Sequence, residues 1–266
     1  MLTNYHTHTT FCDGKDSAED VVKTAIEKGF DAIGFSGHAF TSFDLSYCMQ
    51  SITDYIAEIN RLKEKYKGKI QIYLGIEEDI FEHVNRNNYD YLLGSSHYIK
   101  TKSGIFPIDV GHDHFNTLLE AFNGDRLALA KAYYDGLTEY VLTRKPDIVG
   151  HFDLITKYDE QDGLAFLSNP EYNKLAETYL LQALKSQCIF ELNTGAIARG
   201  YRTSPYPALN LLHLMHKNDG KIMINTDCHN KENLDCFVLE SRKILKDVGF
   251  EYVYVLYDGE FKKDYL

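Results

Sequence analysis

Short apolar segments alternate with amphipathic segments along the whole chain, and this alternation limits the possible folds more than any other feature. The apolar segments have the length of β-strands, and the amphipathic segments repeat apolar residues every three or four positions, as helices do. Strands and helices in this order form βαβ units with a parallel sheet. The expected strands are 2–8, 32–38, 70–79, 91–99, 148–153, 189–195, 222–229 and 252–258.

Six segments between these strands are predicted to be helices. Ser17 followed by Asp20 gives the first of them an N-cap, and Gly29, Gly220 and Gly249 lie where helices should end. Seven or eight βα units favour a closed barrel over an open sheet. Two connections, 100–125 and 154–170, are long enough to suggest functional loops. No linker or repeat interrupts the pattern, so we expect one domain over residues 1–266. The expected helices are 17–30, 52–68, 126–145, 171–186, 208–220 and 237–249.

Composition excludes several classes of function. The formal net charge of -11 argues against a surface that follows a nucleic-acid backbone, since such a surface needs clustered Lys and Arg. The five cysteines are odd in number and show no C-x-x-C spacing, which favours a reducing compartment over a disulfide framework. The sequence "MLTNYHTHTT" lacks the features of a secretory signal, and no apolar run is long enough for a membrane span. We therefore expect a soluble, cytoplasmic protein.

Most of the histidines fall at one kind of position. Six of the eleven lie at or just beyond the C-terminal end of an expected strand, together with three carboxylates. In a barrel of parallel strands these ends meet at one rim, where such barrels hold their catalytic groups. Side chains two apart on a strand point the same way, so His6 and His8 can chelate one ion. The nine residues are His6, His8, Asp13, His38, Glu77, His97, His151, Asp227 and His229.

Taken singly, each of these residues could also have a purely structural role, such as that of a polar strand residue or a hydrogen-bonded buried histidine. Their shared placement favours a centre of two or three divalent metals. The other histidines have different predicted settings: His83, His213 and His216 in exposed positions, and His112 and His114 in a long loop, as loop polars or substrate contacts. Cys12 and Cys228, which flank ligand positions, are interpreted as packing residues.

The set of motifs resembles the polymerase-and-histidinol-phosphatase (PHP) superfamily. The family pattern appears in order as "HTH" (6–8), "GH" (37–38), "GIE" (75–77), "SSH" (95–97), "GHFD" (150–153) and "TDCH" (226–229). The resemblance implies an α/β fold, a distorted (β/α)7 TIM-like barrel with its metal site at the C-terminal rim of the strands. Segment 252–258 would then lie outside the barrel.

The opening "YHTHTTFCDG" and the stretch "ELNTGAIARG...SPYP" (191–207) resemble the histidinol-phosphate phosphatase branch of that superfamily. The resemblance implies a metal-dependent phosphomonoester hydrolase that converts L-histidinol phosphate and water to L-histidinol and phosphate, with a small-molecule substrate and no nucleic-acid or membrane partner. Two alternatives stay open. One is a related phosphoesterase acting on phosphotyrosine, nucleotides or nucleic-acid ends, and the other is a non-catalytic metal-binding module. The oligomeric state is not predicted.

By analogy with the family, the nine residues would hold three divalent ions of Zn, Mn or Fe. His6, His8, Glu77 and Asp227 would bind the first. Glu77, as a bridge, would bind the second with His97 and His151, while Asp13, His38 and His229 would bind the third. Many relatives have histidine at the position of Asp13.

Further roles are expected for residues in and around this set. Glu77, Asp227, His229 and Asp13 are expected to be catalytic. Arg199 and Arg202 are candidates for contacts with the phosphate, since the guanidinium geometry matches phosphate oxygens. Three loop acids could contact a substrate ammonium group or be solvated surface charges: Asp109, Asp159 and Glu160.

Overall fold

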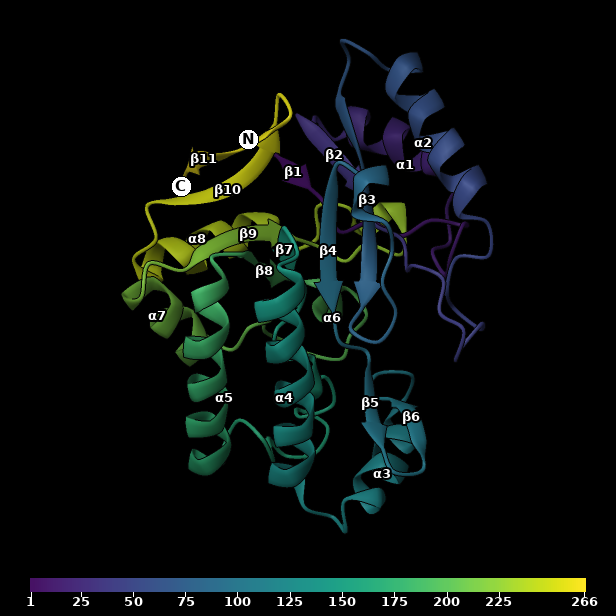
Figure 1. Ribbon diagram of the computed structural model, residues 1–266. Helices are drawn as coiled ribbons and strands as arrows, with labels where there is room; N and C mark the ends of the chain where they lie inside the picture. Colours follow the sequence, from purple (N-terminus) through teal and green to yellow (C-terminus); the bar gives the residue numbers. More distant parts are fainter.

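The computed structural model describes residues 1–266 and is built around a seven-stranded sheet (Figure 1). The strand order is β1-β2-β3-β4-β7-β8-β9, and every neighbouring pair in it is parallel. The strands are β1 (Thr3–Asn4), β2 (Ala32–Phe35), β3 (Gln71–Asp79), β4 (Tyr91–Ser95), β7 (Ile148–Val149), β8 (Ile189–Asn193) and β9 (Lys221–Asn225).

The first and last strands of this order meet, so the sheet is a nearly closed barrel. Beyond the ends of β1 and β9, the His8 amide donates to the Cys228 carbonyl at 2.8 Å, and the Cys228 amide donates to the His6 carbonyl at 3.0 Å. Nearer the strands, the Tyr5 amide donates to Oδ1 of Asn225 at 2.8 Å. The expected distorted seven-stranded barrel is thereby confirmed.

The six expected helices are all present, within a few residues of the predicted limits. In the first, the Ser17 side chain accepts a hydrogen bond from the Asp20 amide, as predicted, and Gly29 follows with a φ of 77°. These helices cover the outside of the barrel, with α4 and α5 side by side (Figure 1). Their bounds are α1 (Ala18–Glu27), α2 (Ile52–Lys65), α4 (Arg126–Arg144), α5 (Pro170–Ala183), α7 (Leu209–Lys217) and α8 (Val238–Val248).

The connection after β4 differs from the expectation. The predicted strand 91–99 ends at Ser95, and an antiparallel hairpin of β5 (Tyr98–Thr101) and β6 (Gly104–Pro107) follows. The next segment is helix α3 (His112–Ala121), which projects with the hairpin below β4 (Figure 1). The interpretation of His112 and His114 as loop residues is therefore wrong. Only Phe115 and Leu118 are buried in this helix, and such a short apolar face gives a weak helical signal.

The C-terminal strand lies outside the barrel, as expected from the resemblance. β10 (Tyr252–Tyr257) pairs antiparallel with β11 (Glu260–Tyr265), a strand that its charged sequence concealed. Both termini lie beside this hairpin, where the N-terminal amine contacts Asp264 at 2.9 Å (Figure 1). Short helical segments complete the fold: α6 (Gly195–Ala198), η1 (Arg86–Asn88), η2 (Leu154–Thr156), η3 (Leu184–Ser186) and η4 (Lys231–Asn233). None of the helices combines the length and apolarity needed to cross a bilayer.

A buried tyrosine packs against the glycines of two neighbouring strands. A Cβ at Gly75 would meet the Tyr91 ring at 2.2 Å, and a Cβ at Gly34 would meet the Tyr91 hydroxyl oxygen at 2.4 Å. The Tyr91 hydroxyl donates to the carbonyl of Tyr5 at 2.6 Å, just beyond the end of β1. Glycine is therefore required in β2 and β3, because no side chain fits between those strands and the ring. The ring and its hydrogen bond tie three neighbouring strands together.

Strand β3 carries three consecutive acids, and alternation sends the middle one away from its neighbours. Glu78 is fully buried and accepts hydrogen bonds from Nε and Nη2 of Arg144 and from the Tyr140 hydroxyl, all at 2.8 Å. Both donors belong to α4, so this network fixes α4 against β3.

We expect Arg144→Ala to lower the free energy of unfolding by roughly 3 kcal/mol, because it leaves a buried carboxylate without its cation. Lys131→Ala on the same helix removes the exposed pair with Asp135 and should leave the free energy of unfolding nearly unchanged. Urea denaturation of both variants measures the difference. Equal stability of the two variants would contradict this role of Glu78.

Candidate metal centre

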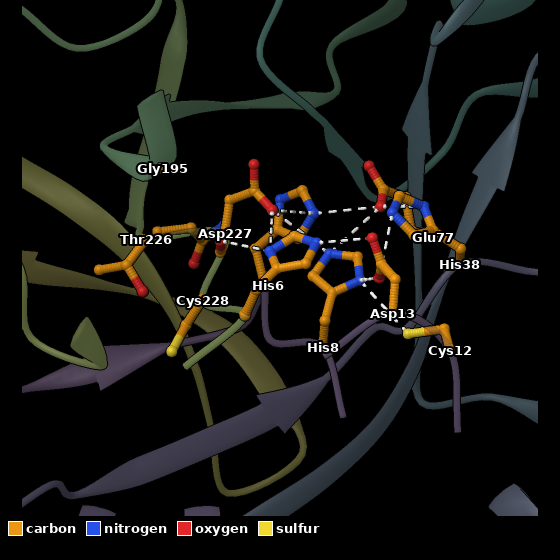
Figure 2. A network of polar contacts seen from close by, with 12 residues as sticks. His6, His8, Cys12, Asp13, His38, Glu77, Gly195, Thr226, Asp227 and Cys228 are labelled. Atoms are coloured by element: carbon orange, nitrogen blue, oxygen red, sulfur yellow. Dashed lines mark hydrogen bonds and ion pairs between the residues drawn. The ribbon is translucent and has the colours of Figure 1, made fainter. Parts of the chain in front are cut away.

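All nine residues predicted as ligands meet at the C-terminal rim of the barrel. They divide into overlapping groups whose possible ligand atoms lie within 4.8 Å of one another. Figure 2 shows His6 and His8, which follow β1, pointing toward His38 after β2, Glu77 on β3 and Asp227 after β9. All but Asp13, which lies in the turn between β1 and α1, sit on or just after a strand, so the barrel itself brings together residues more than 200 positions apart.

Glu77 is the centre of the group. Its Oε2 lies 2.9 Å from Nδ1 of His38 and 3.2 Å from Nε2 of His6. Its Oε1 lies 3.3 Å from Nε2 of both His97 and His151. The carboxylate is fully buried, so one side chain on β3 faces imidazoles from four other parts of the rim.

Asp227 and Asp13 form the other side of the group. Oδ1 of Asp227 lies 3.3 Å from Nε2 of His8 and 3.4 Å from Nδ1 of His229. Oδ2 of Asp13 lies 3.3 Å from Nε2 of His229, and its Oδ1 lies 3.7 Å from Nε2 of His38. The rings of His8 and His229 stack with centroids 3.9 Å apart. Asp13 is the most exposed member, with 36% of its side chain accessible.

The buried nitrogen and oxygen atoms of the cluster are better placed to coordinate metal ions than to hydrogen-bond to one another. Nε2 of His6, Nε2 of His8 and both carboxylate oxygens of Glu77 are buried with no hydrogen-bond partner. Unpaired buried polar atoms are costly, and here they face a common space. Two ligand atoms that bind the same ion at about 2.0–2.2 Å lie about 3 Å from each other, and the nitrogen and oxygen atoms of this cluster have a similar spacing. Imidazole and carboxylate together suit a divalent transition metal.

The buried carboxylates of the cluster favour positive charge among the ligand residues. Burial and the neighbouring His229 and His38 lower the pKa of His8 to about 3, so this ring is a neutral donor. Burial would also lower the pKa of His6, but Glu191, Glu77 and Asp227 raise it well above its usual range. Burial opposes ionisation of Glu77, yet the surrounding histidines keep its pKa well below normal. Without a metal, a proton on His6 supplies the cation that the carboxylates require.

Two buried carboxylates next to the cluster were not predicted. Asp79 accepts from the His97 amide at 3.0 Å, and its Oδ2 lies 3.5 Å from Nδ1 of that ring. Glu191 on β8 lies 3.0 Å from Nδ1 of His6. Both had a signal in the sequence: Asp79 shares a strand face with Glu77, and Glu191 is a charge inside an otherwise apolar strand.

The two predicted arginines have different settings. Arg199 donates from Nη2 to Oδ2 of Asp227 at 2.8 Å, and its Nη1 lies 3.0 Å from Nδ1 of His229. Gly195 permits this approach, since a Cβ there would meet Oδ2 of Asp227 at 2.7 Å. Arg202 is buried beside the ring of Tyr206 and donates to Thr156, away from the cleft.

The remaining candidates lie outside the ligand groups. His83, His213 and His216 are exposed, as predicted. His112 bonds through Nε2 to Oδ1 of Asp162 at 2.6 Å. Cys228 is buried, and its thiol donates to the carbonyl of Asn230 at 2.9 Å. The Cys12 thiol lies 3.5 Å from Nδ1 of His8, at the edge of the cluster (Figure 2).

A cleft of about 260 Å³ opens above the cluster. Its floor includes Asp13, His38, His97, His151, Asp227 and His229. Arg199 lines it, and Tyr47, Tyr98 and Asp109 add aromatic and acidic groups. The cleft therefore joins the cluster to a polar and aromatic chamber large enough for a small molecule.

Known proteins resemble the chain in sequence and in fold. A histidinol-phosphatase of Bacillus subtilis is 25% identical over 84% of this chain and 92% of its own length. A crystal structure from Listeria monocytogenes covers 89% of this chain and 99% of its own, with a TM-score of 0.77 and 22% identity. The histidinol phosphate phosphatase of Lactococcus lactis, solved with zinc, L-histidinol and phosphate, covers 98% and 99%, with a TM-score of 0.63 and 18% identity.

The likeness to these two structures concerns the fold alone, because the identities are low. The family is shown by a sequence match. The model of the PHP domain matches residues 4–195, well over half of the chain and most of the ligand positions. The chain therefore belongs to the PHP domain family.

Proposed function

We propose that the chain is a metal-dependent phosphomonoester hydrolase and that its substrate is L-histidinol phosphate. The observation that carries the reaction class is the set of unpaired, buried donor atoms around Glu77 at the floor of the cleft. The proposed substrate is that of the Bacillus subtilis relative, a histidinol-phosphatase whose sequence aligns over most of its own length and most of this chain. A small phosphomonoester also suits a cleft of about 260 Å³.

The donor set is that of a divalent metal centre, and we infer that it holds three ions. His6, His8, Glu77 and Asp227 would hold one. Glu77 would share a second with His97 and His151, since both imidazoles face its Oε1 at 3.3 Å. The third would lie between Asp13, His38 and His229. Bound divalent ions would activate a water molecule near neutral pH and neutralise charge on the phosphate.

Charge in the cleft favours a phosphate dianion. Three divalent ions bring about +6, and the carboxylates of Glu77, Asp227 and Asp13 return about -3. Arg199 adds a further positive charge at the cleft wall. Its guanidinium already bonds a carboxylate oxygen of Asp227, so it has the geometry to donate to a phosphate oxygen instead. We infer that Arg199 orients the phosphate, while Arg202 supports the wall from behind.

The loop acids considered for the other end of the substrate differ in their surroundings. Asp159 accepts from the amides of Phe166 and Leu167 and is buried within its own loop. Glu160 accepts from the amide of Thr203 at 2.8 Å. Asp109 lines the cleft. We therefore assign contact with the amino or imidazole group of the substrate to Asp109.

Glu77→Ala and His151→Ala should each remove bound metal and lower the rate by at least 100-fold, because the first deletes the shared ligand and the second deletes a ligand of the second ion. His213→Ala is the matched control, since His213 is exposed on α7 and lies outside the ligand groups. Elemental analysis and phosphatase assays on the same preparations measure both effects. A Glu77→Ala protein that keeps full metal content and full activity would end the ligand assignment.

A panel of L-histidinol phosphate, phosphotyrosine, AMP and a phosphodiester tests the substrate. We expect the highest kcat/KM for L-histidinol phosphate and little hydrolysis of the diester. Preference for phosphotyrosine or AMP would keep the reaction class and reject the substrate. Stoichiometric metal with no turnover of any compound would indicate a non-catalytic metal-binding module.

A further inference from the structure

We propose that Glu191 is a positioning residue that holds His6 in the orientation and tautomer needed for metal binding. This inference rests on the proposed metal centre. Glu191 is fully buried on β8, belongs to none of the ligand groups and does not line the cleft. Its two oxygens lie 3.0 and 3.1 Å from Nδ1 of His6. Nε2 of the same ring faces Glu77 at 3.2 Å.

Every other polar contact of Glu191 is a donor directed at its carboxylate. The His151 amide donates to Oε1 at 2.8 Å, and Nδ2 of Asn193 donates to the same oxygen at 2.6 Å. Nδ2 of Asn225 donates to Oε2 at 3.0 Å. These donors come from the ends of three neighbouring strands, so the carboxylate connects β7, β8 and β9 to His6 on the far side of the barrel seam.

Both asparagine amides are locked in the donating orientation. Oδ1 of Asn193 accepts from the Gly195 amide at 2.8 Å, and Oδ1 of Asn225 accepts from the Tyr5 amide at 2.8 Å. Neither amide can rotate without losing its backbone partner. The groups around the Glu191 carboxylate are therefore all hydrogen-bond donors, and they suit a side chain that ends in two acceptor oxygens. A glutamine would place its own NH₂ against one of these donors.

This arrangement allows His6 one ring orientation and one tautomer. With Nδ1–H donated to Glu191, the lone pair on Nε2 is directed at Glu77 and Asp227, the partners expected to share its metal. A carboxylate behind a ligating histidine fixes the ring and raises its basicity, and loss of such a partner typically weakens metal binding about 10–100-fold. A purely structural carboxylate would affect folding without affecting metal affinity.

The test is chelator competition on the holoenzyme with zinc or manganese. We expect Glu191→Gln to bind one ion, the one that His6 would share with His8, Glu77 and Asp227, about 10–100-fold less tightly than the parent protein. Phosphatase activity should fall in limiting metal and recover in excess metal, with the KM for substrate unchanged. Asp159→Asn is the matched control, because Asp159 is a buried carboxylate that accepts backbone hydrogen bonds from Phe166 and Leu167 and belongs to none of the ligand groups. It should lower Tm and leave metal affinity as it was.

A second variant keeps the test decisive if the glutamine protein does not fold. Glu191→Asp retains the charge and withdraws the carboxylate from His6 by one methylene, so it should also weaken metal binding. Parent-like metal affinity in a folded Glu191 variant, with or without a lower Tm, would overturn the inference. If the parent protein itself binds no metal, the proposed function fails instead, so the two failures are distinguishable.

Discussion

The fold brings carboxylates and imidazoles into one buried space, and this concentration of charge is the constraint on which the rest depends. Glu77 is fully buried and faces four imidazoles at 2.9–3.3 Å, and Oδ1 of Asp227 lies 3.3–3.6 Å from the imidazoles of His6, His8 and His229. Buried carboxylates are stable only when cations or donors compensate them. The histidines and Arg199 supply this compensation, and divalent ions would supply it more completely while satisfying the unpaired atoms.

The surrounding structure can be understood as support for that space. The strands place ligands at one rim, and backbone bonds around Cys228 close the seam beneath His6 and His8. Behind the ligands, Glu191 orients the His6 imidazole, and Asp79 accepts a hydrogen bond from the His97 backbone amide. On the outer face of β3, Glu78 anchors α4, so adjacent acids of one strand serve the site and the scaffold separately.

Much of this could be predicted from the sequence because strand ends converge in a parallel barrel whatever the details of packing. The strand-end rule located His38, Glu77 and His151 without knowledge of any contact. Local signals were weaker where few residues are buried, and α3 and β11 were missed for that reason. Glu191 was missed because its role depends on its neighbours across the barrel: only three-dimensional packing shows that Asn193 and Asn225 both turn donors toward it.

The central claim is that the rim residues bind several divalent ions around Glu77. Anomalous X-ray diffraction from crystals grown with zinc or manganese tests it most directly. The account predicts ions between His6, His8 and Asp227, between His97 and His151, and between Asp13, His38 and His229, with Glu77 shared by the first two. Crystals whose anomalous maps are empty at this rim, with His6 and Glu77 paired only to each other, would contradict it.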